Sequence, residues 1–183
     1  MSGSYTPPTL TIPPGPDDWS VGPEVGPVTF VEYGDFECPH CAAMEPILHE
    51  LRLRAGSEMR FVYRHFPLTS SHPHAAIAAE AAEAAGAQGA FWPMHDILFA
   101  NQQALAERDL IGYAAALGID ADAVAAALVD HAYEPNVRED FMSGVRSGVS
   151  GTPTFFINGV RYDGDYELDA IARAVQKAAR LAH

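Results

Sequence analysis

Two cysteines, Cys38 and Cys41, are the residues of this 183-residue chain whose types and spacing most clearly allow chemistry. A disulfide between them would close a loop with only two intervening residues, so the pair cannot act as a long-range covalent staple. Because the chain has no other cysteine, a structural disulfide framework is excluded. A close Cys-x-x-Cys pair leaves two alternatives, a redox-active dithiol or half of a metal site.

The residues between the cysteines favour a reactive thiol. Only the thiolate attacks a disulfide, and a free cysteine with a pKa of roughly 8.5 is mostly protonated at neutral pH. Pro39 is typical of the first position of a helix, so Cys38 is expected at the cap as an exposed nucleophile, where backbone N–H groups and the helix dipole favour negative charge. The dipole contributes at most about 2 kcal/mol, and we expect His40 to add a charge-assisted hydrogen bond. Cys41, one turn into the helix, is then the buried thiol that resolves a mixed disulfide.

The metal alternative needs two further ligands at a compatible spacing, and the chain has no third cysteine. The histidines show no spacing typical of a zinc finger, although His72 and His74 could together bind a metal weakly at the surface. Attachment of c-type haem requires a histidine directly after the second cysteine, where this chain has Ala42. We therefore predict no metal site and no bound cofactor.

The elements that flank the cysteines determine how the pair is positioned. Residues 28–33 are β-branched and aromatic with apolar side chains on both faces, which predicts a buried central strand. Residues 34–37 turn the chain, and the apolar residues after Cys38 show helical spacing. Glu32 interrupts the strand on the same face as Phe30. A buried carboxylate is costly unless it has a partner or transfers protons, and the alternative is a side chain that reaches solvent at the strand end.

The rest of the pattern alternates between strands and helices. A second strand is expected at residues 59–66, a helical block from 72 to about 149, a hairpin with an Asn-Gly turn at 154–162, and an amphipathic helix at 167–181. The order is β-α-β, then helices, then β-β-α, which predicts an α/β fold.

The domain organisation follows from this order, because the helical block separates two halves of one sheet. We expect an α/β core formed by residues 28–66 and 151–183, with an inserted all-helical subdomain at 67–150. Residues 1–27 hold seven prolines and are expected to form an extended arm with at most one short edge strand at 9–12.

Two separate motifs together resemble one protein family. Cys38-Pro39-His40-Cys41 after a buried strand, combined with the distant run Gly151-Thr152-Pro153-Thr154-Phe155-Phe156, is similar to the DsbA-like branch of the thioredoxin superfamily. The segments DFECPHC at 35–41, RHFP at 64–67 and FWPMH at 91–95 further resemble a bacterial DsbA-like subgroup. The resemblance covers nearly all of residues 28–183. It implies a thioredoxin-like fold with an inserted helical subdomain, and thiol-disulfide exchange with protein thiols.

The resemblance also implies roles for particular residues. Thr152-Pro153 is expected to be a cis peptide against the cysteine pair, with the backbone of residue 152 open to an extended substrate segment. Glu32 lies six residues before Cys38, where the family carries a buried acid that exchanges protons with the resolving thiol. Phe36 is expected to border the substrate site as a hydrophobic rim, with a core position as the alternative. The predicted catalytic residues are thus Cys38, Cys41, His40, Pro39 and Glu32, and the predicted substrate-binding residues are Thr152, Pro153 and Phe36.

The direction of electron flow has opposing indications. His40 within the pair would stabilise the reduced form and make the disulfide oxidising, whereas a cytosolic thiol pool would keep the pair reduced. Thr152 also departs from the valine of the best-known DsbA proteins. We expect DsbA-like oxidase chemistry, and the alternatives are a cytosolic disulfide reductase or a redox-sensing or metal-handling module.

Composition limits the partners. With 11 Lys+Arg against 24 Asp+Glu, the formal net charge of −13 disfavours nucleic acid and anionic lipid. No run of 18 apolar residues occurs, so membrane insertion is not expected. Residues 1–27 contain neither a basic start nor an apolar core, which predicts a cytoplasmic location, with export after removal of a signal peptide as the alternative. The expected partners of this presumed monomer are protein thiols or disulfides and a redox partner protein or small thiol.

Overall fold

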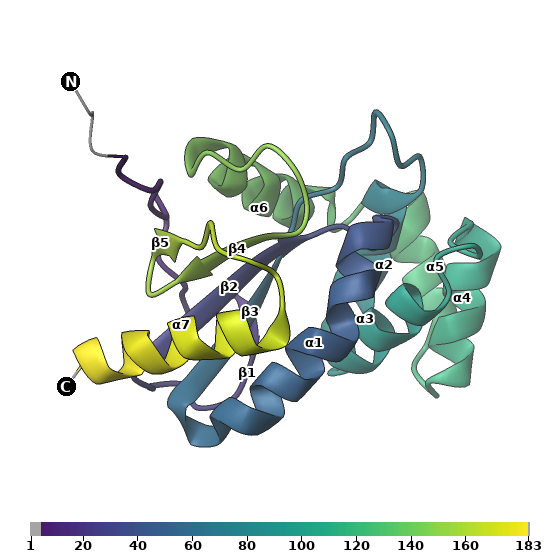
Figure 1. Ribbon diagram of the computed structural model, residues 1–183. Coiled ribbons are helices and arrows are strands. Elements are labelled where there is room, and N and C mark those ends of the chain that lie inside the picture. Colours follow the sequence, from purple (N-terminus) through teal and green to yellow (C-terminus); the bar gives the residue numbers. More distant parts are fainter. Residues whose placement is uncertain (1–4, 183) are drawn as a thin grey trace.

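A mixed five-stranded sheet forms the centre of the computed structural model, which describes residues 5–182 (Figure 1). The strands lie in the order β1-β3-β2-β4-β5. Only β2 and β3 are parallel, and every other neighbouring pair is antiparallel. Their bounds are β1 (Trp19–Val21), β2 (Val28–Gly34), β3 (Met59–His65), β4 (Thr154–Ile157) and β5 (Val160–Arg161).

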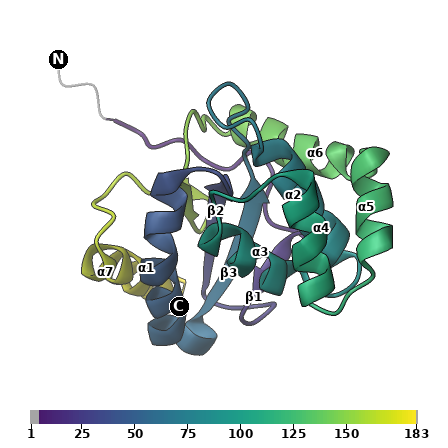
Figure 2. The same cartoon turned by 90° about the vertical axis from the view of Figure 1, so that its right-hand side faces the viewer.

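Helices cover both faces of this sheet. α1 (Pro39–Ala55) and α7 (Leu168–Leu181) lie on one face, and α6 (Glu134–Arg146) lies on the other, as the two views show (Figures 1 and 2). The remaining helices of the block are α2 (Ala75–Gly86), α3 (Phe91–Ala100), α4 (Glu107–Ala116) and α5 (Ala121–Val129). The predicted α/β fold with an all-helical insertion between the second strand and the hairpin is confirmed.

β2 is the central strand because both of its faces are apolar. Val28 and Phe30 pack in the core under α1 and α7, while Val31 and Tyr33 pack in a second cluster with Phe66 on the α6 side. Burial on both sides explains why the strand reads as a continuous apolar run rather than an alternating one. Glu32, on the Phe30 face, is therefore enclosed by the core.

The arm departs from its prediction over residues 5–27, and residues 1–4 of the predicted arm lie outside the described residues. It contributes a true strand, β1, which pairs antiparallel with β3, whereas the expected edge strand at 9–12 is reduced to a single bridge between Thr9 and Val160. β1 forms because Trp19 stacks on Phe91 at 4.6 Å between ring centroids and donates its indole N–H to Glu83 at 2.6 Å. These partners belong to the helical block and lie far along the chain.

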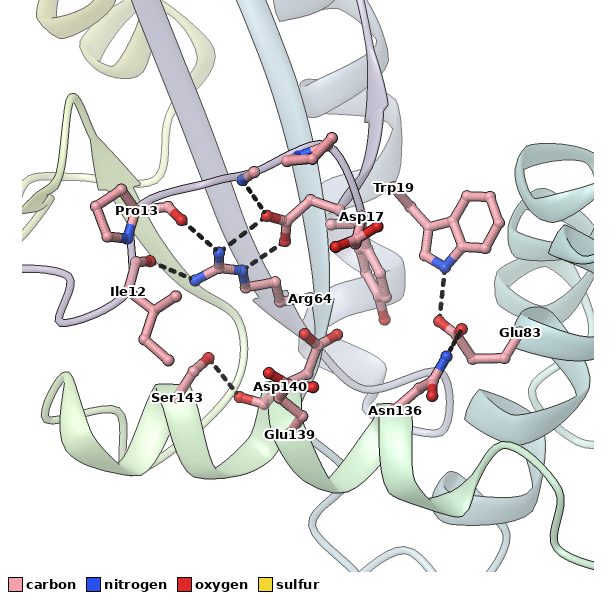
Figure 3. A pocket seen from close by; sticks show the side chains of 14 residues that line it. Ile12, Pro13, Asp17, Trp19, Arg64, Glu83, Asn136, Glu139, Asp140 and Ser143 are labelled. Carbon is pink, nitrogen blue, oxygen red and sulfur yellow. Dashed lines mark hydrogen bonds and ion pairs between the residues drawn. The ribbon is translucent and has the colours of Figure 1, made fainter.

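Arg64 fixes the arm to the sheet (Figure 3). Its guanidinium makes a two-pronged ion pair with Asp18, at 2.7 Å and 3.0 Å, and donates to the carbonyl of Ile12 at 2.9 Å and to the Tyr33 hydroxyl at 3.0 Å. The side chain is only 4% exposed, so these bonds are shielded from water. Arg64 and Asp18 line a cavity of about 630 Å³ that lies between the arm, β3 and α6.

Removing this buried cation tests its structural role. We expect Arg64→Met to lower the free energy of unfolding by about 3–5 kcal/mol, because Asp18 is then left as an unpaired buried charge. Arg54→Met is the matched control, since the Arg54 pairs with Glu50 and Asp169 are exposed and contribute at most about 1 kcal/mol. Urea denaturation of both variants measures the difference, and equal losses would contradict the anchoring role.

Candidate active site

Cys38 lies at the junction between β2 and α1, as the N-cap residue of the helix. The turn before it is closed by Asp35, whose side chain accepts the N–H of Glu37 at 2.8 Å and whose carbonyl accepts the N–H of Cys38 at 3.1 Å. An aspartate that bonds the backbone two residues ahead stabilises a turn of this kind. Pro39 follows at the helix start, where the N–H it lacks has no partner to lose.

The environment of Cys38 favours its thiolate and lowers its pKa to about 5. The largest cause is a hydrogen bond donated by the thiol of Cys41. Burial opposes the shift, and contacts from Thr152 and from the backbone N–H groups of Cys41 and His40 reinforce it. The expectation of an exposed sulfur is wrong, since Cys38 is only 3% exposed and its Sγ lies 3.5 Å from the carbonyl oxygen of Thr152.

Cys41 has the opposite character. It is fully buried, and burial is the largest cause that raises its pKa, followed by its hydrogen bond to Cys38 and the negative charge of Glu32. Both cysteines are unpaired in this structure. Cys38 therefore ionises while Cys41 retains its proton, which is the division of roles expected of a nucleophilic and a resolving thiol.

Glu32 lies in the core beneath the cysteines. Its side chain is fully buried and neither carboxylate oxygen has a hydrogen-bond partner. Burial raises its pKa well above the ordinary value, and the nearby charge of Glu45 adds to the effect. The prediction of a buried acid is confirmed, and the alternative of a side chain that reaches solvent is wrong. A carboxyl group here can give a proton to Cys41 while it is neutral, and it can take one back once it is ionised.

Several polar groups near Glu32 were not identified from the sequence. Glu45, Tyr63 and His95 each have a buried polar atom without a hydrogen-bond partner. Glu45 could have been found from its spacing, because it lies four residues after Cys41 on the same face of α1. Tyr63 and His95 could not, because an aromatic residue in a buried strand and a histidine in an apolar helix are ordinary core residues.

His40 differs from its prediction. Its side chain is exposed, and within residues 5–182 the ring makes no hydrogen bond with the protein. The second position of a helix directs the side chain outward, so the contribution of His40 to the Cys38 thiolate comes from its backbone N–H. The expected charge-assisted hydrogen bond from the ring is therefore wrong.

Thr152 and Pro153 lie beside Cys38 although 114 residues separate Cys38 from Thr152. β4 pairs antiparallel with β2, with Thr154 opposite Tyr33, and this register brings the segment before β4 to the start of α1. The Thr152-Pro153 peptide bond is cis, as the resemblance implied. Tyr166 donates its hydroxyl to the carbonyl of Pro153 at 3.3 Å and supports the loop from α7's side.

Phe36 does not form a rim around the site, and this expectation is corrected. Its side chain is 1% exposed and stacks on Tyr63 and Phe99 at centroid distances of 5.3 Å and 4.9 Å. The core alternative is therefore right, because the turn at residues 35–37 directs the ring inward against the helical block. Its carbonyl instead accepts a hydrogen bond from Gln102 at 2.8 Å, and the same amide nitrogen donates to the carbonyl of Cys38 at 2.8 Å.

Neither cysteine belongs to a cluster of metal-ligand type within the described residues. The one such group there is Glu45, His95 and Asp96, in which His95 Nδ1 is already bonded to Asp96 at 2.9 Å. No helix between residues 5 and 182 is both long and apolar enough to cross a bilayer.

Comparison with known proteins agrees with this site. A family model described as thioredoxin matches residues 15–177. Two solved structures share the fold: BdbD from Bacillus subtilis (TM-score 0.82, 20% identity, 96% of this chain and 97% of that chain) and a thioredoxin-like oxidoreductase from Silicibacter pomeroyi (TM-score 0.79, 25% identity, 92% and 95%).

A different kind of relative is a region of the Na(+)/H(+) antiporter NhaA 1 of Salinispora arenicola. It is 51% identical over 170 residues, which is 92% of this chain but 26% of that protein. This chain thus spans about a quarter of the length of the curated relatives it matches.

The fold and the cysteine site define a thioredoxin-like protein with a helical insertion. The chain belongs to the thioredoxin family, and it shares its fold with the two solved structures.

The two sulfurs should differ sharply in reactivity. We expect iodoacetamide to label Cys38 with a rate that follows a pKa of about 5, while Cys41 stays unmodified until the protein unfolds. Mass-spectrometric mapping between pH 4 and pH 8 measures this preference. The Cys38→Ser variant is the control and should show no labelling in that range, whereas labelling of Cys41 first would contradict the assignment.

Proposed function

We propose that this protein is a protein thiol-disulfide oxidoreductase that works through the Cys38 and Cys41 pair without a bound cofactor. The observation that carries the proposal is the opposite ionisation of two thiols in one helical turn, with the cis Thr152-Pro153 segment beside the nucleophile. A stable thiolate next to a protonated resolving thiol is the arrangement that dithiol exchange requires.

The exchange proceeds in two balanced steps. A substrate thiolate attacks Sγ of Cys38 in the disulfide, the Cys38–Cys41 bond breaks, and the Cys41 sulfur takes a proton from the neutral carboxyl of Glu32. One of the two protons that the substrate thiols release then returns to Glu32. A second substrate thiolate then attacks the substrate sulfur of the mixed disulfide, and Cys38 leaves as thiolate. The substrate loses two electrons and becomes a disulfide, and the pair gains them. Thr152 presents its backbone to the substrate segment, as an added strand would need.

The Cys38 thiolate favours net oxidation of substrates. A thiol with a pKa of about 5 stabilises the reduced pair at pH 7 by about 3 kcal/mol relative to an unperturbed thiol. For a two-electron couple this corresponds to roughly 60 mV toward a more oxidising potential. Disulfide reduction in the cytoplasm is the alternative direction, and the measured potential of the pair against glutathione distinguishes the two. The cytoplasmic location stays a prediction.

A membrane transport protein is our proposed partner class. The observation behind it is the 51% identity to a region of a protein named as a Na(+)/H(+) antiporter, in which the matching region is about a quarter of the length. Because a region of a transporter shares this sequence, a transporter is the membrane protein that this domain is expected to contact. Its substrates would then include cysteines of the transporter.

Trapping of mixed disulfides tests both proposals. Cys41→Ser should accumulate covalent complexes with protein substrates, because the mixed disulfide then lacks the thiol that resolves it. Non-reducing gels and mass spectrometry of membrane and soluble fractions identify the captured chains. The double variant Cys38→Ser/Cys41→Ser is the control and should capture none. Absence of complexes with Cys41→Ser would contradict the oxidoreductase, and complexes confined to soluble proteins would contradict the transporter.

The variant Glu32→Gln tests two separate effects of Glu32, one on the rate of disulfide exchange and one on the stability of the fold. We expect slower formation of mixed disulfides from the Cys38–Cys41 disulfide by roughly 10- to 100-fold, because the amide cannot give a proton to the Cys41 sulfur as the bond breaks. The free energy of unfolding of the variant should also increase relative to that of the wild type as pH rises. The raised pKa of Glu32 in the folded state gives wild-type stability that is complete below the ordinary pKa and is lost as pH rises toward the folded pKa.

The stability advantage of Glu32→Gln should therefore grow by about 1.4 kcal/mol per pH unit in that window. Urea denaturation at pH 5, 6, 7 and 8 measures the trend. Val31→Ala, on the opposite face of β2, is the control, since its loss should not depend on pH. A constant difference between Glu32→Gln and the wild type would show that Glu32 is already ionised.

A further inference from the structure

A segment of the insertion clasps the turn that carries Cys38. This clasp, residues 66–74, follows β3 and rises beside the start of α1 (Figure 1). It contacts the turn at residues 34–37 through five hydrogen bonds: Phe66 N to Gly34 O (2.7 Å), Leu68 N to Asp35 Oδ2 (2.8 Å), His72 Nδ1 with Asp35 Oδ2 (2.7 Å), His74 N to Glu37 Oε2 (2.6 Å) and His74 Nδ1 with Glu37 Oε1 (3.0 Å).

Asp35 is the centre of these contacts. Its side chain is 0% exposed and binds the N–H groups of Glu37 and Leu68 as well as the His72 ring, while its backbone carbonyl binds the N–H of Cys38. A carboxylate out of contact with water is costly to keep charged unless a cation is paired with it. The one ring within hydrogen-bond distance of Asp35 that can carry a positive charge is His72, which is 18% exposed.

The ionisable groups that face His72 are Asp35, Glu37 and Cys38 from the turn, and His74 follows two residues later in the clasp. Burial lowers the pKa of His72. The hydrogen bond to Asp35 and the negative charges of Asp35, Cys38 and Glu37 outweigh that effect and raise it. The attraction between two charges is mutual, so the imidazolium of His72 favours the Cys38 thiolate as much as the thiolate favours the imidazolium.

We propose that His72 is a redox-linked proton site, which takes up a proton when the Cys38–Cys41 disulfide is reduced and releases it when the disulfide forms again. The proposal rests on the proposed function and adds a regulatory group to it. A substrate dithiol supplies two electrons and releases two protons as it becomes a disulfide. The Cys38–Cys41 bond breaks, Cys41 takes one proton, and Cys38 remains a thiolate. His72 holds a share of the second proton, because the new negative charge at Cys38 raises its proton affinity.

Two consequences follow for the pair. Protonation of His72 stabilises the reduced form, so the disulfide becomes a stronger oxidant as pH falls through the His72 titration. The histidine that tunes the nucleophile is then in the clasp rather than between the cysteines, since the His40 ring projects into solvent.

Titration of the wild-type protein tests the proposal without a variant. NMR of the His72 ring protons from pH 5 to pH 9 should give a higher midpoint in the reduced than in the oxidised protein. The expected change in proton affinity is about twofold to fivefold, the scale of a charge–charge interaction at a partly hydrated site. Cys38→Ala, which cannot form the thiolate, should give the midpoint of the oxidised protein. Equal midpoints in the two redox states would overturn the proposal.

Variants separate an electrostatic role from a structural one. His72→Gln keeps a hydrogen-bond donor toward Asp35 but cannot be charged. It should therefore raise the proton affinity of the Cys38 thiolate by the same twofold to fivefold factor and remove the added pH dependence of the potential. His74→Gln is the matched control in the same clasp and should leave that dependence in place. A loss of pH dependence in both variants, or in neither, would contradict the assignment to His72.

Failure of the His72 proposal can be distinguished from failure of the proposed function. If the wild-type protein fails to exchange disulfides with reduced, unfolded ribonuclease or with insulin, the oxidoreductase proposal fails. The His72 titration in the oxidised and the dithiothreitol-reduced protein still decides whether His72 is a redox-linked proton site.

Discussion

The structure depends on a single constraint, which is that two thiols in one helical turn must ionise at different pH. Cys38 lies at the N-cap, where unpaired backbone N–H groups face its sulfur, and Cys41 lies inside the helix with no exposed surface. The Cys41 proton can then serve as a hydrogen-bond donor to the Cys38 thiolate. Burial in the apolar face of the sheet raises the pKa of Glu32, and a neutral Glu32 places no negative charge next to the Cys38 thiolate.

The sheet topology collects the groups that satisfy this constraint. β2 carries Glu32 and ends in the turn before Cys38, so the acid and the nucleophile belong to one continuous segment. The parallel neighbour β3 ends at the same edge and leads into the clasp, while the antiparallel neighbour β4 begins there and is preceded by Thr152. Three chain segments therefore converge at one edge of the sheet, and only the central position of β2 allows this.

The sequence predicts the parts of this arrangement that local patterns encode. The apolar run of β2, the Cys-Pro-His-Cys start of α1 and the acid at position 32 all follow from periodicity and spacing. β1 could not be predicted, because Trp19 finds its partners Glu83 and Phe91 only when the helical block folds against the sheet. The role of Gln102 could not be predicted either, because a glutamine in a polar loop has no sequence pattern that indicates which carbonyl groups it will bind.

Two of the three errors in the site, those at Phe36 and His40, have the same physical origin. The sequence places Phe36 and His40 next to the cysteines along the chain, but side-chain direction depends on the turn and the helix. The turn directs Phe36 into the core against Tyr63, and the second helical position directs His40 into solvent. Spacing alone thus identifies which backbone carries the chemistry, and only the tertiary contacts identify which side chains face it. Glu32, Glu45, Tyr63 and His95 are a further example of side chains that only the folded core brings together, and each has a buried polar atom without a hydrogen-bond partner. An unsatisfied buried polar group costs about 1–3 kcal/mol, so a core shaped only for stability favours apolar side chains at such positions.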